Sequence, residues 1–275
     1  MNAGAYDDDL ELALAAARAA GPAIMNAFRT DHEVTYKSAD QPLTAADLEA
    51  NRIIHEWLIT ARPEYGWLSE ETIDHPARLE REWVWIVDPI DGTHSFVAGR
   101  PEFAISIALA VAGEVVVGVI ANPATGETFW AVRGGGAYGL PDRPLRVRPH
   151  AGSATTLLAA SRSELKRGEF ALFTGDWEFL PVGSTAYKLA KVASGAADAF
   201  LSRGPKSEWD VAAGDLIVRE SGGRVTDLKG DTLHYNRPDP YIHGVLATSG
   251  PWHDDLLARA RQLAPTGTLR GDDGG

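Results

Sequence analysis

Apolar residues recur along the chain with two different spacings, which predict helices in some stretches and strands in others. In residues 8–28 they recur every three or four positions, the spacing of one helix face. A second predicted helix runs from Thr44 to about Ala61. Its expected buried side consists of Leu48, Ile53, Ile54, Trp57 and Leu58. The N-terminal part of the chain is therefore predicted to contain two amphipathic helices.

Short apolar and β-branched runs predict strands in the rest of the first half. They are residues 34–37, 83–87, 103–111, 115–122 and 127–132. The short connections between the last three favour an antiparallel sheet. The glycines at 134–136 lack the G-K-[ST] ending of a nucleotide-binding loop, so they predict a tight turn between strands.

In the second half, predicted strands alternate with predicted helices. The strands are residues 156–160, 179–182, 199–201 and 245–248, and the helices are residues 185–194, 210–220 and 252–263. The stretch 141–149 is rich in Pro and Arg, so we place a subdomain boundary there, between residues 1–145 and 146–275. The tail at 265–275 is expected to be disordered.

The stretch Trp83–Phe96 combines a buried strand with polar groups at its end. Pro89 is expected to end the strand, so that Asp88 and Asp91 project into one small volume with the Ile90 carbonyl between them. Carboxylates held this close predict a divalent cation between them. For the D-P-x-D pattern alone, an Asp-rich turn with an Asx cap is the alternative.

The residues that follow predict an anion site beside the carboxylates. Gly92 lets backbone amides approach an anion closely, and Ser95 and Phe96 are expected to open a helix whose N-terminus faces the same point.

Composition excludes several classes of protein. The 275 residues contain no Cys, which excludes disulfides, thiolate nucleophiles and Cys-ligated metals. A net charge of −12 disfavours nucleic-acid binding, and no apolar run is long enough to span a membrane. The acidic N-terminus lacks a signal-peptide pattern, which predicts a cytoplasmic protein.

Two signatures carry a resemblance to a known family. W-I-V-D-P-I-D-G-T-H-S-F at 85–96 resembles the first signature of the inositol monophosphatase superfamily of magnesium-dependent, lithium-sensitive phosphomonoesterases. W-D-V-A-A-G-D at 209–215, followed by E-S-G-G at 220–223, resembles the second. The resemblance covers about residues 8–263. It implies an α+β fold, a layered α/β/α/β/α sandwich with the site between its two sheets, and a possible homodimer.

The resemblance also implies a site with two or three Mg²⁺ ions. One ion would be held by Glu70, Asp88 and the Ile90 carbonyl, and a second by Asp88, Asp91 and Asp210. Ligands that are all oxygen suit Mg²⁺ rather than Zn²⁺. Alone, Glu70-Glu71 would be solvated surface and Asp210 a helix N-cap, and Ser69 stands where the family usually has glycine.

Asp47 and Thr93 are the implied pair that orients the attacking water, so Asp47, Glu70 and Thr93 are the predicted catalytic residues. Thr44 and Asp47 also form a variant of the capping box, which is a competing role for this carboxylate.

The predicted substrate is a small phosphorylated molecule. Its expected contacts are Gly92, Thr93, Ser95, Gly183, Ser184, Arg203 and Lys206. Inositol-specific members of the family have an acidic residue a few positions before W-D. This chain instead has R-G-P-x-x-E-W-D at 203–210, which is similar to the bacterial 3'(2'),5'-bisphosphate nucleotidases. S-R-S at 161–163 is similar to the same nucleotidases. We therefore predict hydrolysis of the 3'-phosphate of adenosine 3',5'-bisphosphate, with Arg203 or Lys206 contacting the second phosphate.

Other features favour alternatives. The stretches 103–109 and 133–137 resemble the inositol phosphatase branch, and His94 matches neither branch. Inositol-1-monophosphatase, histidinol-phosphatase and fructose-1,6-bisphosphatase activities stay open. A non-catalytic phosphate- or metal-binding regulator is the alternative of another class, disfavoured because every predicted carboxylate, Thr93 and Asp47 are present.

Overall fold

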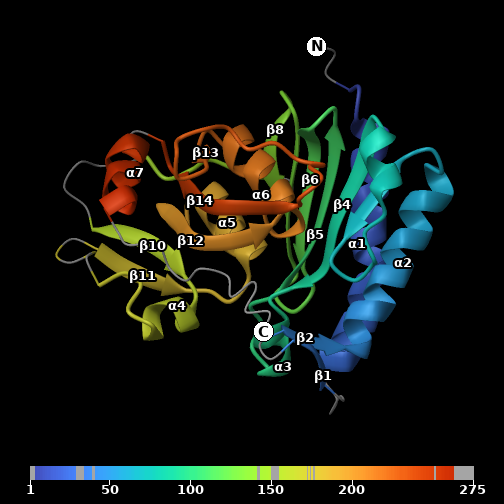
Figure 1. Ribbon diagram of the computed structural model, residues 1–275, viewed down its shortest axis with the longest axis horizontal. Coiled ribbons are helices and arrows are strands. Elements are labelled where there is room, and N and C mark those ends of the chain that lie inside the picture. The colour runs from blue at the N-terminus through green and yellow to red at the C-terminus, as the bar shows by residue number, and fades with distance from the viewer. Residues whose placement is uncertain are drawn as a thin grey trace, which may run out of the picture.

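Helices and sheets alternate across the molecule as five layers, helix, sheet, helix, sheet, helix (Figure 1). The computed structural model describes residues 4–28, 34–38, 41–140, 143–149, 155–171, 173, 175, 177–250 and 252–262. The layering confirms the predicted α+β sandwich. The tail predicted to be disordered lies outside the described residues.

The first sheet has seven strands in sequence order, β3 to β9. β3 is parallel to β4, and every other neighbouring pair is antiparallel, as predicted for this half. The strands are β3 (Gly66–Ser69), β4 (Trp83–Asp91), β5 (Ala104–Val111), β6 (Glu114–Asn122), β7 (Glu127–Val132), β8 (Gly136–Gly139) and β9 (Arg143–Pro144).

The second sheet has five strands in the order β11-β10-β12-β14-β13. β10 is parallel to β11 and β12, whereas β14 is antiparallel to β12 and β13, so the sheet is mixed. The strands are β10 (Thr156–Ala160), β11 (Trp177–Pro181), β12 (Ala199–Ser207), β13 (Arg224–Thr226) and β14 (Tyr241–Thr248). β12 runs six residues past the predicted 199–201, with an irregular register between Ser202 and Pro205.

The helices fill the three remaining layers. α1 and α2 cover the outer face of the seven-stranded sheet, α5 and α6 lie between the sheets, and α7 lies on the far side (Figure 1). α4 lies below β11 in this view, where it contacts α5. Their bounds are α1 (Asp7–Phe28), α2 (Ala45–Ala61), α3 (Thr93–Val97), α4 (Arg162–Lys166), α5 (Thr185–Ala193), α6 (Glu208–Glu220) and α7 (His253–Gln262). A short hairpin of β1 (Val34–Ser38) and β2 (Gln41–Thr44) precedes α2, and a 3₁₀ helix spans Pro76–Glu80. No helix in the described part of the chain is both long and apolar enough to cross a membrane.

The sheets are apolar on both faces because both faces are covered. In β4, Val84 and Ile86 pack into the core between the sheets, whereas Trp85 and Val87 pack under α1 and α2. A third core lies between the five-stranded sheet and α7. This is why these strands are continuous apolar runs rather than alternating ones.

Pro89 does not end β4, contrary to the prediction. The strand continues to Asp91, and the pairing with β5 shifts register between Asp88 and Asp91. Pro89 lies in this irregular stretch, where a residue without an N–H breaks no ladder hydrogen bond. The bulge, rather than a strand end, therefore directs the two carboxylates.

The glycine-rich stretch at 134–136 is the predicted turn, between β7 and β8. The backbone N–H groups of Gly134 and Gly136 donate to the two carboxylate oxygens of Glu220, at 2.8 and 2.9 Å. The loop therefore binds the C-terminal end of α6.

α6 lies against the seven-stranded sheet at a glycine. A Cβ at Gly118 of β6 would lie 2.7 Å from the carbonyl oxygen and 3.1 Å from the Cα of Ala213 in α6. Backbone atoms cannot move aside cheaply, so only glycine fits there.

Gly118→Ala is therefore expected to lower the free energy of unfolding by about 1–3 kcal/mol, the usual cost of overpacking a core. Urea denaturation measures this difference. Gly204→Ala is the control, because a Cβ at Gly204 meets no atom within 4 Å. Equal unfolding midpoints for the two variants would contradict the close approach of α6.

Candidate active site

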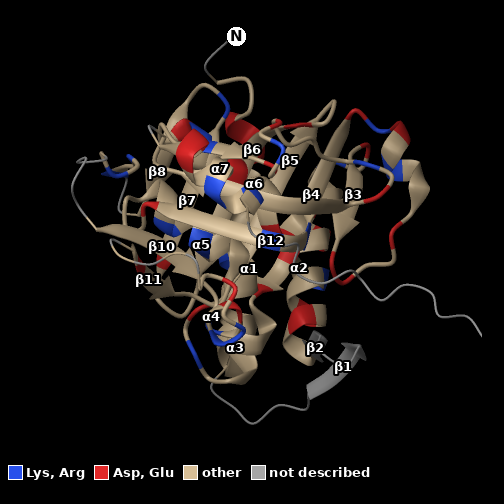
Figure 2. Cartoon of the chain, turned by 60° about the vertical axis from the view of Figure 1, so that its left-hand side comes forward, with Lys and Arg blue, Asp and Glu red and all other residues tan. Residues whose placement is uncertain are grey.

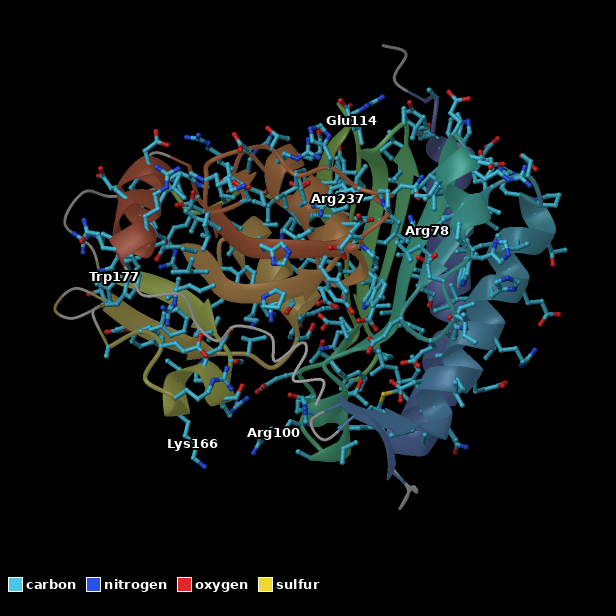
Figure 3. All side chains as sticks on the ribbon, in the orientation of Figure 1. Arg78, Arg100, Glu114, Lys166, Trp177 and Arg237 are labelled. Atoms are coloured by element: carbon cyan, nitrogen blue, oxygen red, sulfur yellow. The ribbon has the colours of Figure 1, made fainter. Side chains whose placement is uncertain are left out.

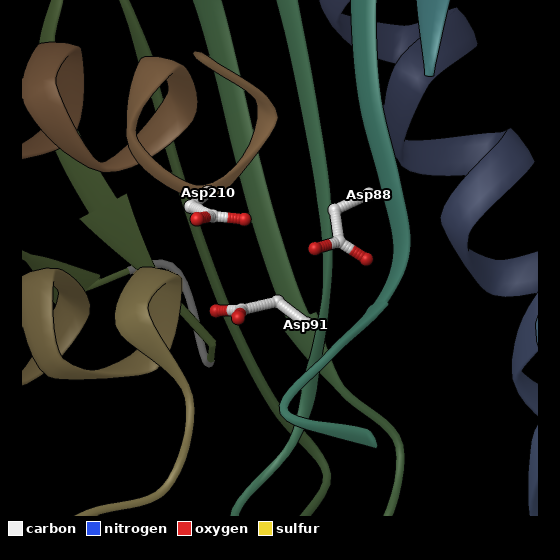
Figure 4. A group of neighbouring side chains, drawn as sticks. All are labelled: Asp88, Asp91 and Asp210. Carbon is white, nitrogen blue, oxygen red and sulfur yellow. The ribbon is translucent and has the colours of Figure 1, made fainter. Parts of the chain in front are cut away.

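Three aspartate side chains converge between the two sheets, as Figure 4 shows. Asp88, Asp91 and Asp210 each offer a carboxylate oxygen, and these oxygens all lie within 4.8 Å of one another. Asp88 and Asp91 come from the bulged end of β4, whereas Asp210 comes from the first turn of α6. The sequence placed all three together correctly, although they belong to different halves of the chain.

Local hydrogen bonds fix the two carboxylates of β4. The Ile90 N–H donates to Oδ1 of Asp88 at 3.0 Å. The hydroxyl of Ser184 and the N–H of Ala186 both donate to Oδ2 of Asp91. Ser184 is the N-cap of α5, so the start of that helix holds Asp91 from the opposite half of the chain.

Asp210 is not the N-cap of α6. That position belongs to Ser207, and Asp210 is the third helical residue, whose carboxylate accepts the Ser207 N–H at 3.1 Å. The predicted alternative of a simple N-cap is therefore wrong in position, although the side chain does contribute to a capping box. The same carboxylate faces Asp88 and Asp91, so capping and cation binding are compatible.

The buried carboxylates of the aspartate cluster repel one another. Burial, followed by repulsion from Glu70, Asp91 and Asp210, raises the pKa of Asp88 well above its ordinary value. Burial and then the charge of Asp91 raise the pKa of Asp210 to about 8. Burial also raises the pKa of Asp91, and the hydrogen bonds from Ser184 and Ala186 oppose that rise. Oxygen donors whose charges repel one another are suited to a hard divalent cation.

Glu70 borders this cluster at the end of β3. Its N–H donates to the Val87 carbonyl at 3.2 Å, which ties it to β4, and its charge acts on Asp88. Ser69, which precedes it, is buried, and its hydroxyl donates to Oδ1 of Asn51 at 2.8 Å. Glu70 is therefore in place to extend the carboxylate set.

Asp47 and Thr93 meet across 46 residues of sequence. Thr93 Oγ1 lies 3.3 Å from Oδ1 of Asp47 and 3.1 Å from the Ile90 carbonyl oxygen. The other oxygen of Asp47 accepts both the N–H and the hydroxyl of Thr44, at 2.8 and 2.6 Å. The capping box and the pairing with Thr93 therefore coexist, each on its own carboxylate oxygen.

The predicted phosphate-binding turn is tightly packed. Gly92 has φ 97°, and a Cβ there would lie 3.0 Å from the Glu102 carbonyl oxygen. A Cβ at Gly183 would lie 1.9 Å from the hydroxyl oxygen of Ser95. The turn at 91–95 and the turn before α5 therefore touch, and both glycines are required for this contact.

The two predicted cations, Arg203 and Lys206, lie in one cleft of about 580 Å³ beside α4. Arg203 donates to the Glu169 carbonyl at 3.0 Å, and its side chain is largely buried. The backbone of Lys206 belongs to the ladder between β12 and β14. Its side chain makes no ion pair or hydrogen bond with another described residue, and its charge opposes the burial-driven rise in the pKa of Asp210. The charge of Lys206 acts on Asp91 and Asp210 and also on Glu164, whereas Arg203 is anchored to the cleft wall. Figure 2 shows both signs of charge around α4.

The sequence did not reveal a buried ion pair beneath the cluster. Lys188 of α5 lies 3.4 Å from Oε2 of Glu164 in α4, and both side chains are buried. Glu164 also accepts the N–H and hydroxyl of Ser161, both at 2.7 Å. The position of Lys188 on the inner side of a predicted helix could have indicated a buried charge. Nothing in the sequence identifies Glu164 as its partner.

Comparison with known proteins gives a consistent picture. The sequence model described as the inositol monophosphatase family matches residues 6–265. An inositol-1-monophosphatase of Rhizobium meliloti (strain 1021) is 40% identical over 206 residues, covering 72% of this chain and 76% of that protein. A 3'(2'),5'-bisphosphate nucleotidase CysQ of Aggregatibacter actinomycetemcomitans is 30% identical over 234 residues, covering 82% and 87%.

A solved structure is similar as well. The extragenic suppressor protein suhB of Bartonella henselae superimposes with a TM-score of 0.79 at 32% identity, covering 92% of this chain and 98% of that one.

Proposed function

The chain belongs to the inositol monophosphatase family of phosphoric monoester hydrolases, and on that premise we propose that it is a magnesium-dependent enzyme that removes the 3'-phosphate of adenosine 3',5'-bisphosphate. The single observation that carries the substrate choice is Lys206, a cation beside the aspartate cluster without an ion-pair partner among the described residues. Inositol monophosphate has no second phosphate that could bind Lys206.

The proposed metal site uses the residues that converge at the end of β4. Asp88, Asp91, Asp210, Glu70 and the Ile90 carbonyl would hold two or three magnesium ions. Their oxygen-only chemistry and mutual repulsion fit this cation. Bound magnesium supplies Lewis-acid chemistry to the phosphate and to the attacking water.

Thr93 and Asp47 are the proposed groups that orient and deprotonate the water. The Thr93 hydroxyl has one proton and two acceptors in reach, Asp47 and the Ile90 carbonyl. When it donates to Asp47, its lone pairs are free to accept a hydrogen bond from the water. As the water's proton moves to Oγ1 of Thr93, the hydroxyl's own proton moves to the Asp47 carboxylate, which is the final acceptor. Thr44 holds the other oxygen of Asp47, which keeps this carboxylate oriented toward Thr93.

The second phosphate is proposed to contact Lys206 in the cleft beside α4. Arg203 and Arg167 line the same cleft, but Glu169 engages both, with Nε of Arg167 2.7 Å from its carboxylate. Lys206 is therefore the cation that a second phosphate can reach without breaking an existing contact. Arg203 is proposed to shape the cleft rather than to bind substrate directly.

Lys206→Ala is expected to lower kcat/KM for adenosine 3',5'-bisphosphate roughly 10- to 100-fold, the effect of losing one hydrogen bond to a charged group. Any effect of the lost charge on Asp91 and Asp210 is shared by both substrates, so the measurement is the ratio of the kcat/KM values for adenosine 3',5'-bisphosphate and inositol 1-phosphate. Lys166→Ala is the matched control, because Lys166 is an exposed cation at the outer end of α4 (Figure 3).

Inositol-1-monophosphatase activity is the second candidate, favoured by the relative of that name at 40% identity. A turnover screen with magnesium over adenosine bisphosphate, inositol, histidinol and fructose phosphates decides between them. A wild type that prefers inositol 1-phosphate, or a Lys206→Ala ratio equal to that of wild type, would overturn the nucleotidase proposal.

A further inference from the structure

An ion pair joins the two halves of the chain next to the aspartate cluster. Both terminal nitrogens of Arg162, at the start of α4, contact the carboxylate of Glu102, just before β5, and one of these contacts is 2.6 Å. The fork of the guanidinium matches the two carboxylate oxygens, the strongest geometry for such a pair. The two residues are 60 positions apart in the sequence.

The backbone of Glu102 is part of the site. Its carbonyl oxygen is the nearest atom to a Cβ built on Gly92, at 3.0 Å, and lies 3.2 Å from one built on Gly183. Gly92 follows Asp91, and Gly183 precedes Ser184, the residue whose hydroxyl donates to Asp91. A shift of Glu102 would therefore displace both sides of the Asp91 contact.

The other end of the ion pair leads back to the same aspartate. Arg162 lies two residues before Glu164, which pairs with Lys188 of α5. Lys188 lies one helical turn after Ser184, and Ser184 holds Asp91. Glu102, α4, the Glu164–Lys188 pair, α5 and the turn at Asp91 thus form a closed ring of contacts.

The aspartate cluster straddles the two halves of the chain. Asp88 and Asp91 lie on β4, whereas Asp210 and the donors to Asp91 lie on α6 and α5. A displacement between the halves would change the spacing of the three carboxylates.

We propose that Glu102 and Arg162 are a positioning pair, which closes this ring and fixes Asp91 for divalent-cation binding. The pair touches neither substrate nor cation. It acts through the Glu102 carbonyl and through α4. The inference rests on the metal dependence in the proposed function, but not on the choice of substrate.

The test is calorimetric titration of the full-length protein with Mg²⁺ in the absence of substrate. Glu102→Gln and Arg162→Gln are each expected to weaken Mg²⁺ binding about 10-fold, the lower end of the effect of losing an outer-shell partner. Because they break one contact, the double variant should be no weaker than either single variant. The charge swap Glu102→Arg with Arg162→Glu should recover part of the affinity.

Glu114→Gln is the matched control. Glu114 pairs with Arg133 at 2.6 Å, and it lies at the end of the molecule opposite Arg100 and Lys166 (Figure 3). This variant should bind Mg²⁺ as wild type does.

Two outcomes separate the proposals. A wild type that binds no Mg²⁺ overturns the metal-dependent function and, with it, the positioning pair. A wild type that binds Mg²⁺, together with wild-type affinity in both single variants or additive losses in the double variant, overturns the positioning pair alone.

Discussion

Asp91→Asn is expected to lower kcat about 10²- to 10³-fold while the protein stays folded, as when one preorganised electrostatic group is removed. The amide oxygen of asparagine can still accept the hydrogen bonds from Ser184 and Ala186, so α5 stays in place. Only the charge that faces Asp88 and Asp210 is lost. Turnover at saturating Mg²⁺ measures the first effect, and thermal unfolding measures the second.

The thermal stability of Asp91→Asn should depend less on Mg²⁺ than that of wild type. Without divalent cation it should melt at or above the wild-type temperature, since one charge fewer repels Asp88 and Asp210. Added Mg²⁺ should raise its melting temperature less than that of wild type.

Asp9→Asn is the control with the opposite outcome. Asp9 is buried in α1 and accepts from Arg62 at 2.9 Å, so its loss should lower stability and leave turnover intact. Wild-type turnover in Asp91→Asn, or full activity of the exhaustively chelated wild type, would contradict the proposed metal site.

Thr93→Val should lower kcat by about 10²-fold or more, the usual contribution of a group that takes part in proton transfer, and change KM little. Valine keeps the shape of threonine but removes the hydroxyl that lies 3.3 Å from Asp47. Thr93→Ser keeps the hydroxyl and should retain most of the activity. Steady-state kinetics on all three proteins measures the difference.

Asp47→Ala separates the two roles of that carboxylate. It should lose turnover as Thr93→Val does, and it should also lose stability, because a helix cap contributes about 0.5–2 kcal/mol. Thr44→Ala removes the hydroxyl of the capping box and measures how much of that stability belongs to the cap. If Asp47→Ala only lowers the melting temperature and keeps kcat, Asp47 serves the cap alone.

The period of the apolar residues predicted the elements well but not every buried face. In α2, Leu48 and Trp57 were expected inside, yet they are 50% and 47% exposed. Ile54 and Leu58 are buried as predicted, and the buried face continues through Ala46 and Ala50, which were not predicted. Ala46 and Ala50 allow α2 to pack closely against its neighbours. A prediction based on the positions of large apolar side chains does not identify such alanines as buried.

Local spacing was sufficient to bring Asp88, Ile90 and Asp91 together, because they lie within four residues, whereas only the family resemblance added Asp210 to the cluster. The partners that hold the cluster are different. Glu102 and Arg162, or Glu164 and Lys188, have no spacing rule that relates them, and only the packing of α4 brings each pair together. Family resemblance identified the chemistry, whereas the supporting contacts required the three-dimensional structure.

The position of α6 between the sheets has a consequence for how the chain is made. All residues of the seven-stranded sheet are synthesised before α6, which begins at Glu208. Until α6 is made, it cannot cover the sheet face that holds Ala104, Ala108 and Gly118. The first half therefore has an apolar face that only the second half covers, so this face stays exposed while the second half is being synthesised. Until the second half is made, this exposed apolar face is the part of the nascent chain most prone to aggregation.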